Sequence, residues 1–595
     1  MSPSVVPDVD VPVLVVGGGP SGLLIAHMLA KFGVRSLIVE RYATRLAAPK
    51  AHALSPRTLE FSRQFGLDVN KIRQVGTSRN DAFWVNFVTN LSDERVGKLP
   101  YERMDADVLD ATPTMIHNIP QPEFEQIIAD ELDNNTLVKI RKNHSFVDLE
   151  DHDSYVTTTI EDRNDGSKYQ IRSKHVVACD GAKSAVKNFL QVESEGEDSY
   201  ETMMTIHINA DLRPVVNENV GMLHWVMDPR VSGFIIAYSL SGNQVMICNF
   251  DSEKYPVSSW NEEHCREVVN SAIGQSVPFK ILSYRPWVLS RKVAKSYRVG
   301  NVFLAGDAAH AFPPTGGLGL NSGLGDVHNL AYKLAAAHQG WGGERLLESY
   351  QADRQQVALV NSEQSIKNGK QIFGLLRALG ATDPDKDVAW QNLKQRLHTN
   401  DPKTKMVIEE GIKGQREHFD NLGLHIGYVY GNREVPADAS IFKPVAVPGA
   451  RLPHAWISLR EETYSTHLSL PPIDNSFVKE LSQEEANAKM FSTLDLIPFD
   501  TFIVIADREH GLGWSSSLEE IYRELPQSLK IDVIMRGVHF DVDESDENSR
   551  QWLNLTGLAE GKAILVRPDQ HILAVFSKES RAEDLVGILR AHLDV

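Results

Sequence analysis

The chain has few cysteines, and they form no pattern that binds metal or cycles between thiol and disulfide. Cys179, Cys248 and Cys265 are the three cysteines among 595 residues, and no Cys-x-x-Cys pair occurs. An odd and sparse count excludes a disulfide framework, and it argues against a structural zinc site or a thioredoxin-type redox pair. We therefore predict a cytoplasmic protein that binds no metal.

Positive charge is also scarce. The 61 lysines and arginines are outnumbered by 79 aspartates and glutamates, which gives a formal net charge of −18. An acidic chain repels phosphate backbones, so we expect no nucleic-acid partner. Anions can still be bound locally, through backbone N–H groups at helix N-termini.

A continuous apolar run that could cross a membrane is missing as well. Residues 11–30 carry no formal charge, but Gly-Gly-Gly-Pro-Ser-Gly interrupts them, and Asp8 and Asp10 stand where a signal peptide has positive charge. A strand, a turn and a helix explain the segment better, and we expect no membrane partner. With 42% apolar and 24% charged residues, the 595-residue chain has the composition of a globular protein with several domains.

A dinucleotide-binding fingerprint stands near the N-terminus. Val13–Val16 predicts a buried strand, Gly17-x-Gly19-x-x-Gly22 follows, and a helix over 21–32 leads to a strand over 34–39 that ends at Glu40. The glycines allow a tight turn, a close approach of a pyrophosphate and helix–strand packing, while the carboxylate accepts hydrogen bonds from a ribose. The alternative is a glycine-rich turn of any α/β protein. This unit alone does not show whether the cofactor is FAD or NAD.

Two further motifs follow predicted strands. Residues 174–178 lead into Cys179-Asp180-Gly181, and residues 299–305 lead into Gly306-Asp307-Ala308-Ala309-His310. Asp307 would project at the carboxyl edge of the sheet, where it could bind the hydroxyls of a polyol such as ribityl. The glycines of Pro314–Asn321 would let a flat ring rest on the backbone, before a helix over 322–338. Taken alone, this stretch also fits an Asp-capped turn and a plain glycine-rich loop.

In this order and spacing, the three motifs closely resemble those of the class A flavoprotein aromatic hydroxylases. The chain is most similar to the phenol hydroxylase branch, which includes polyketide hydroxylases and carries a C-terminal thioredoxin-like domain. The resemblance covers most of the chain and implies FAD as the cofactor. The residues it assigns to FAD are Gly17, Gly19, Gly22, Glu40, Arg41, Lys50, Ala51, Gln121, Asp180, Asp307, Pro314, Gly319, Leu320 and Asn321. Leu318 stands where the family commonly has Gln, and Cys179 where it usually has Ala.

The resemblance also implies the reaction. NAD(P)H, bound transiently, would reduce FAD, and O₂ would form a flavin C4a-hydroperoxide that hydroxylates a phenolic ring. His52 is our candidate for the base that deprotonates the phenol, because an imidazole titrates near neutrality. Tyr238 is a second catalytic candidate, since its hydroxyl could bond the substrate. Substrate contacts are predicted for His52, Trp225, Tyr238 and Tyr284.

We expect an α/β fold in which a Rossmann-like FAD-binding part (about 1–85, 110–200 and 290–435) is interleaved with an antiparallel-sheet substrate part (about 86–109 and 201–289). Two helices are predicted over 348–363 and 364–379. Residues 436–595 would form a thioredoxin-like domain without Cys-x-x-Cys, which could support a homodimer.

Two other functions stay open. The chain could be a flavin epoxidase or oxidase acting on a polyketide-like substrate. It could also be a non-catalytic FAD-binding protein that binds partner proteins, although such a protein would not need an open ring-binding loop beside a candidate base.

Overall fold

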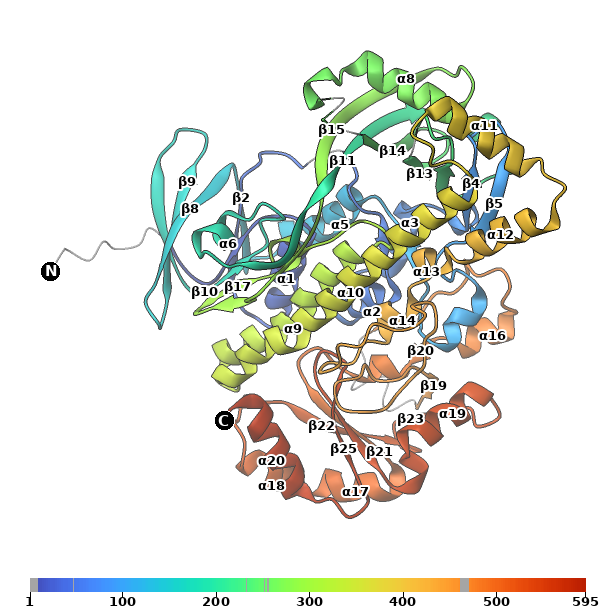
Figure 1. The fold of residues 1–595 in the computed structure, drawn as a ribbon. Coiled ribbons are helices and arrows are strands. Elements are labelled where there is room, and N and C mark those ends of the chain that lie inside the picture. Colours follow the sequence, from blue (N-terminus) through green and yellow to red (C-terminus); the bar gives the residue numbers. More distant parts are fainter. Residues whose placement is uncertain (1–8, 46–47, 232, 251, 254–255, 461–469) are drawn as a thin grey trace.

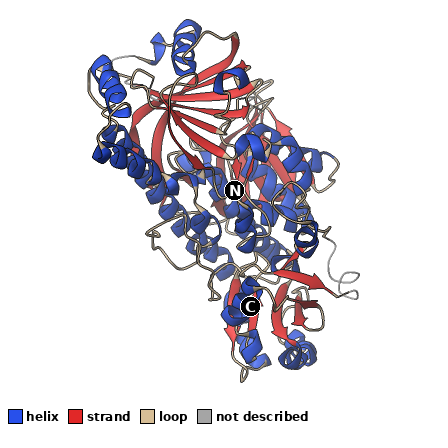
Figure 2. Ribbon diagram, turned by 90° about the vertical axis from the view of Figure 1, so that its right-hand side faces the viewer, coloured by secondary structure: helices blue, strands red, loops and turns tan. Residues whose placement is uncertain are grey.

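The computed structural model describes residues 9–595 except 46–47, 232, 251, 254–255 and 461–469. The described residues form three large sheets, flanked by helices and arranged from the top to the bottom of the molecule (Figures 1 and 2). None of the described helices combines the length and apolar character needed to cross a membrane.

The first sheet is built around β1, in which Val11 and residues 13–16 are buried. Its main path runs β16-β17-β10-β1-β2-β7, and β8 and β9 extend it beside β10. β1 pairs in parallel with β10 and β2, and β10 pairs in parallel with β17. The bounds are β1 Val9–Val16, β2 Ser36–Glu40, β7 Val138–Lys142, β8 His144–Asp151, β9 Val156–Asp162, β10 Lys168–Ala178, β16 Arg298–Val299 and β17 Val302–Leu304.

Helix α1 packs against both α5 and α9 beside this sheet, and the three helices share its apolar core. The helix expected over 322–338 begins one turn earlier, because Gly317 adopts a left-handed conformation that starts α9 at Leu318. The helices of this part are α1 Pro20–Lys31, α2 Pro56–Gln64, α3 Val69–Val75, α4 Arg79–Ala82, α5 Gln121–Asp133, α6 Ala185–Phe189 and α9 Leu318–Gln339.

The second sheet has the order β18-β15-β11-β14-β13-β12-β4-β5. Its antiparallel pairing is as expected, except that β4 and β12 pair in parallel. The strands are β4 Trp84–Val88, β5 Arg95–Pro100, β11 Ser194–Ala210, β12 Leu223–Val226, β13 Gly233–Ser239, β14 Asn243–Phe250, β15 Phe279–Ala294 and β18 His310–Ala311. Helix α8 (Glu262–Ile273) covers one face through a separate apolar cluster.

The two helices predicted over 348–363 and 364–379 are in fact one helix, α10 (Glu344–Ala378). It runs past both α9 and the second sheet (Figure 1). Polar residues such as Asn361, Gln364 and Asn368 are buried along it, so its middle has no clean apolar stripe to mark a continuous helix. It is followed by α11 Lys386–Leu397, α12 Pro402–Lys413, α13 Arg416–Phe419 and α14 Leu422–Ile426.

The third sheet lies at the C-terminal end, in the order β20-β19-β23-β22-β21-β24-β25. β21 and β22 are parallel, whereas β24 pairs antiparallel with β21 and β25, so a βαβ unit ending at β22 is followed, after β23 and α19, by a ββα unit. Its elements are β19 Trp456–Leu459, α16 Gln483–Ala488, β20 Phe491–Ser492, β21 Phe502–Asp507, α17 Arg508–Ser516, α18 Leu518–Arg523, β22 Ile531–Arg536, β23 Phe540–Asp541, α19 Glu547–Thr556, β24 Ala563–Val566, β25 Ile572–Phe576 and α20 Ala582–Leu593.

A buried ionic network joins this sheet to α9 and α10. Asp353 of α10 accepts hydrogen bonds from Lys333 of α9 at 2.8 Å and from Arg567 of the β24–β25 turn at 3.0 Å. Arg567 also binds Asp569, which accepts a 3.1 Å hydrogen bond from Asn329 of α9. These charges are buried, so each depends on its partners for the solvation it has lost.

We predict that Arg567→Met destabilises the folded chain by about 3–5 kcal/mol, because it leaves Asp353 and Asp569 short of a buried cation. The change should appear as a lower urea midpoint. Lys562→Met is the control, since its side chain is 46% exposed, and it should cost less than about 0.5 kcal/mol. Equal midpoints for the two variants would show that the network adds nothing to stability.

Candidate functional site

A cavity of about 540 Å³ opens where the carboxyl ends of β1, β2, β10 and β17 meet. Its outer part is lined by the loops that carry the three sequence motifs. Its inner part is lined by β12, β13 and β14 of the second sheet and by α13. The sheets therefore bring residues from the first 53 positions together with residues beyond 300.

The first loop closes tightly around its glycines. Gly17 has φ +106°, and a Cβ there would lie 2.3 Å from the carbonyl oxygen of Cys179. A Cβ on Gly22 would lie 1.9 Å from the carbonyl oxygen of Gly17, whereas Gly19 has open space around it. Helix α1 starts directly afterwards, at Pro20. The loop thus offers unobstructed backbone and a helix N-terminus to an anion.

Glu40 ends β2 beside this loop, as the motif predicts. Its carboxylate accepts hydrogen bonds from the N–H of Gly18 at 2.7 Å and from the N–H of Tyr42 at 2.9 Å. These bonds fix the carboxylate at the cavity wall. Arg41 and Asp180 line the same part of the cavity. Asp180 also accepts a 2.7 Å hydrogen bond from the N–H of Ala185, so one of its oxygens caps a turn.

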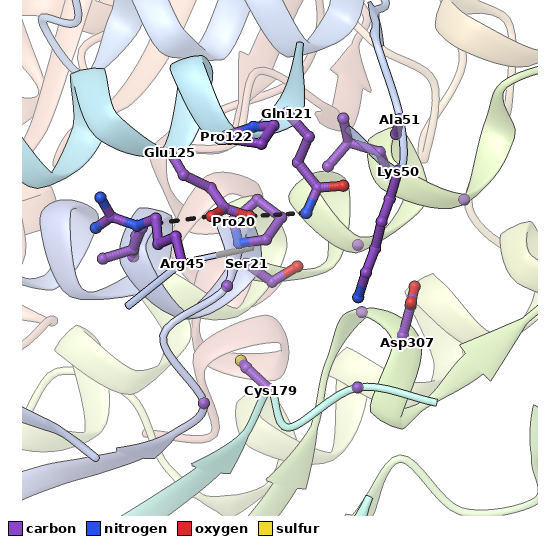
Figure 3. A pocket seen from close by; sticks show the side chains of 18 of the residues that line it. Pro20, Ser21, Arg45, Lys50, Ala51, Gln121, Pro122, Glu125, Cys179 and Asp307 are labelled. Atoms are coloured by element: carbon purple, nitrogen blue, oxygen red, sulfur yellow. Dashed lines mark hydrogen bonds and ion pairs between the residues drawn. The ribbon is translucent and has the colours of Figure 1, made fainter. Parts of the chain in front are cut away.

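Lys50 and Asp307 face one another across the cavity (Figure 3). Asp307 is exposed and has no hydrogen bond or ion pair with the residues that the structure describes. Burial lowers the pKa of Lys50, with a further contribution from nearby Arg285, while Asp307 opposes the change. The carboxylate of Asp307 is therefore a free acceptor, in the short 3₁₀ helix (Gly306–Ala308) that follows β17.

Gln121 lines the cavity next to Lys50 and Ala51, and it belongs to a short polar chain. Its backbone N–H donates to the carbonyl oxygen of Ala51 at 3.0 Å, and its side chain donates to Glu125 at 2.7 Å. Glu125 in turn lies 3.6 Å from Arg45, and all three side chains are drawn in Figure 3. Sequence reasoning missed Arg45 and Glu125, although Glu125 lies one helical turn after Gln121.

The glycine-rich loop before α9 forms the opposite wall. Pro314, Gly319 and Leu320 line the cavity, and Gly316 and Gly317 have φ +100° and +64°. The side chain of Asn321 points elsewhere. It accepts from the Ser55 N–H at 2.8 Å and donates to the Ala53 carbonyl oxygen at 2.9 Å. Asn321 thereby ties this loop to the segment that carries His52.

Leu318 and Cys179, the two residues that depart from the family pattern, differ in whether they line the cavity. Leu318 is buried in a small apolar cluster with Leu424 and Ala439, and it is not among the residues that line the cavity. Cys179 does line the cavity, and burial raises the pKa of its thiol. The leucine therefore does not place an apolar side chain on the cavity wall.

His52 lies at the inner end of the cavity. Its Nε2 is 2.9 Å from the hydroxyl oxygen of Tyr101, and its ring packs edge-on against that of Tyr238 at 5.7 Å. Burial lowers the pKa of His52 to about 4, so its imidazole is neutral at pH 7 but is a weaker base than the near-neutral imidazole expected from the sequence. Tyr238 lies behind His52 and is not part of the cavity wall.

Aromatic side chains form the inner wall. Trp225 stacks on Phe234 at 4.8 Å and meets the edge of His418 at 5.3 Å, and Phe419 stacks on His418 at 4.4 Å. All four line the cavity, together with Tyr101 and Glu102. The sequence motifs indicated only Trp225 among these residues. Tyr284, also predicted, is 40% exposed on β15 and is not brought to the cavity.

Comparison with known proteins assigns a family model, described as FAD binding domain, to residues 10–365. Tetracenomycin A2 monooxygenase-dioxygenase of Streptomyces glaucescens is 27% identical over 98% of this chain and 96% of its own. The 2,4-dichlorophenol 6-monooxygenase of Cupriavidus pinatubonensis is 26% identical over 98% of this chain and 96% of its own. Among solved structures, the flavin-dependent monooxygenase PieE in complex with FAD and substrate superimposes with a TM-score of 0.86, at 25% identity, over 99% of this chain and all of that one.

We predict that Gly22→Ala yields protein with at least about tenfold less bound FAD, because the added Cβ would collide with the backbone of Gly17. The ratio of flavin absorbance to protein absorbance after purification measures this. Gly369→Ala is the matched control, since its Cβ would meet nothing within 4 Å. Full flavin content in Gly22→Ala would contradict the assignment of this loop.

Proposed function

This chain belongs to the FAD-binding domain family, and from that membership we propose that it is an NAD(P)H-dependent monooxygenase that hydroxylates a phenolic aromatic compound. The expected resemblance to phenol and polyketide hydroxylases is confirmed by the relatives, which include monooxygenases of phenol, of 2,4-dichlorophenol and of tetracenomycins. FAD is its cofactor, as the solved relative with bound FAD also indicates. One oxygen atom of O₂ would enter the ring, and the other would leave as water.

The residues of the cavity fit FAD. Gly17, Gly19 and Gly22 would hold the pyrophosphate at the start of α1, where no side chain obstructs the backbone. Glu40 would accept from the adenosine ribose, and the unpaired carboxylate of Asp307 from the ribityl chain. The remaining contacts would come from Arg41, Lys50, Ala51, Gln121, Asp180, Pro314, Gly319, Leu320 and the backbone of Asn321. When bound, reduced flavin supplies the activation of O₂.

The protein's own part in the chemistry centres on His52. Its neutral imidazole would accept a hydrogen bond from the substrate phenol and take the proton as the ring reacts, when the hydroxyl becomes strongly acidic. Tyr101 fixes the imidazole through Nε2. The aromatic wall of Trp225, Phe234 and Phe419 would exclude water from the reacting atoms. Tyr238 packs against His52 from outside the cavity wall, and it would hold the imidazole ring in place.

The finer architecture is also part of this proposal. Residues of the first sheet would be the Rossmann-like FAD-binding part and those of the second sheet the substrate part. The βαβ then ββα order of the third sheet supports a thioredoxin-like domain, and we propose that it serves structure or dimer formation in the cytoplasm. Its packing on α9 and α10 through Arg567 supports a structural role.

The observation that carries the function is a single cavity in which flavin-binding loops and His52 meet an aromatic chamber. The test is NAD(P)H oxidation by the purified holoenzyme, with and without a panel of phenols. We expect at least one phenol to raise the rate well above the basal oxidation. A protein that oxidises no NAD(P)H under any of these conditions would instead favour a non-catalytic FAD-binding protein, and hydrogen peroxide without a hydroxylated product would indicate an oxidase.

We predict that His52→Ala retains FAD but lowers the hydroxylation rate about 10²-fold, because the phenol loses its proton acceptor. Product formed per NAD(P)H consumed, measured by chromatography, should fall accordingly. His398→Ala provides the control, since that imidazole is 62% exposed and distant from the cavity wall. If His52→Ala forms as much product per NAD(P)H as the unaltered enzyme, His52 is not the base.

A further inference from the structure

Glu102 lies at the inner end of the cavity in a loop of unusual backbone geometry. It follows β5, and both Glu102 and Arg103 adopt left-handed conformations, with φ of +49° and +51°. Two consecutive non-glycine residues rarely take this conformation unless the surrounding structure holds them. Glu102 is only 5% exposed, and it lines the cavity.

The carboxyl group of Glu102 has an oxygen without a partner. Oε2 is buried and makes no hydrogen bond with the described part of the chain, and no cation in that part forms an ion pair with the group. The other oxygen, Oε1, lies next to the glycine-rich loop, since a Cβ on Gly317 would be 3.6 Å from it. An unpartnered polar atom in a buried site is costly unless a ligand supplies the partner.

The surroundings keep this carboxyl uncharged. Burial, and then the negative charge of Asp420, raise the pKa of Glu102 well above its usual range, and hydrogen bonding from Tyr101 does not offset them. Asp420 has its own pKa raised to about 6 by burial, against the opposing effect of Arg103 and Arg416. A neutral carboxyl group carries an O–H donor, and a proton on Oε2 has no hydrogen-bond acceptor among the described residues.

Other polar atoms of the same wall are also unpaired. Trp225 Nε1 and His418 Nδ1 are buried without a hydrogen-bond partner among the described residues, and both side chains line the cavity. Around them the wall is apolar, with Phe234, Ile236 and Phe419. The inner chamber thus combines apolar surface with hydrogen-bonding atoms that polar groups of a ligand would satisfy.

We propose that Glu102 is a substrate-binding residue that donates a hydrogen bond to a second oxygen of the aromatic substrate, apart from the phenol that His52 contacts. This inference rests on the proposed function. It names the substrate class as a phenol that carries a carbonyl or hydroxyl oxygen elsewhere on its ring system. Glu102 then determines specificity, because a ligand without that oxygen leaves the buried O–H unpaired.

The test uses two bicyclic phenols that differ in one oxygen. 5-Hydroxy-1-tetralone carries a ketone, and 5,6,7,8-tetrahydro-1-naphthol has the same skeleton without it. Their Kd values are measured on the FAD-loaded enzyme by the change in flavin absorbance. Glu102→Leu removes the donor, and Glu102→Gln keeps an N–H donor of similar size. Asp107→Asn is the control, because that side chain is 69% exposed in the 3₁₀ helix (Ala106–Asp110) after the loop.

We expect the unaltered enzyme to bind the ketone more tightly, and Glu102→Leu to weaken ketone binding about tenfold while changing the other Kd less than about twofold. Glu102→Gln should retain most of the preference, and Asp107→Asn all of it. Equal affinity of the unaltered enzyme for the two compounds, including failure to bind either, overturns the proposal, as does an equal loss for both in Glu102→Leu. If the preference follows Glu102 but neither compound yields a product heavier by one oxygen, Glu102 keeps its binding role and the hydroxylase function fails.

Discussion

The parallel pairing of β1 with β2 and β10, and of β10 with β17, is the constraint on which the site depends. Val16 lies opposite Val39 and Ala178, and Ala178 lies opposite Leu304. Because parallel strands end at the same edge of a sheet, the loops that follow them must meet there. Gly17, Glu40, Cys179 and Asp307 come together for this reason.

The inner end of the cavity depends on polar contacts between distant segments. Asn321 binds the segment that carries His52, while Arg57 of α2 donates to Gln570 at 2.6 Å and to the carbonyl oxygen of Asp569 at 2.7 Å. The β24–β25 turn of the third sheet is therefore hydrogen-bonded to α2, the helix that directly follows the His52 segment. A buried charge network is costly when incomplete, so it favours one relative placement of these parts. The position of His52 follows from contacts made on both sides of the cavity.

Local sequence patterns predicted the strand–turn–helix units and their functional ends, because a glycine turn or a carboxylate after a buried strand is determined within a few residues. They did not predict Tyr101, Glu102 or His418, which lie in no motif and reach the cavity only through the packing of β5 and α13. The continuity of α10 was missed because its middle buries Asn361 and Gln364 instead of apolar residues. Arg567 lies 214 residues from Asp353, and nothing local in the sequence indicates that the two are partners.

We propose that the cavity directs an oxygen atom of O₂ into an aromatic ring. Turnover of a stimulating phenol under ¹⁸O₂, followed by mass spectrometry of the product, tests this most directly. The account predicts one ¹⁸O atom in each molecule of hydroxylated product. Product that carries oxygen from water, or oxidised substrate with no added oxygen, would contradict it.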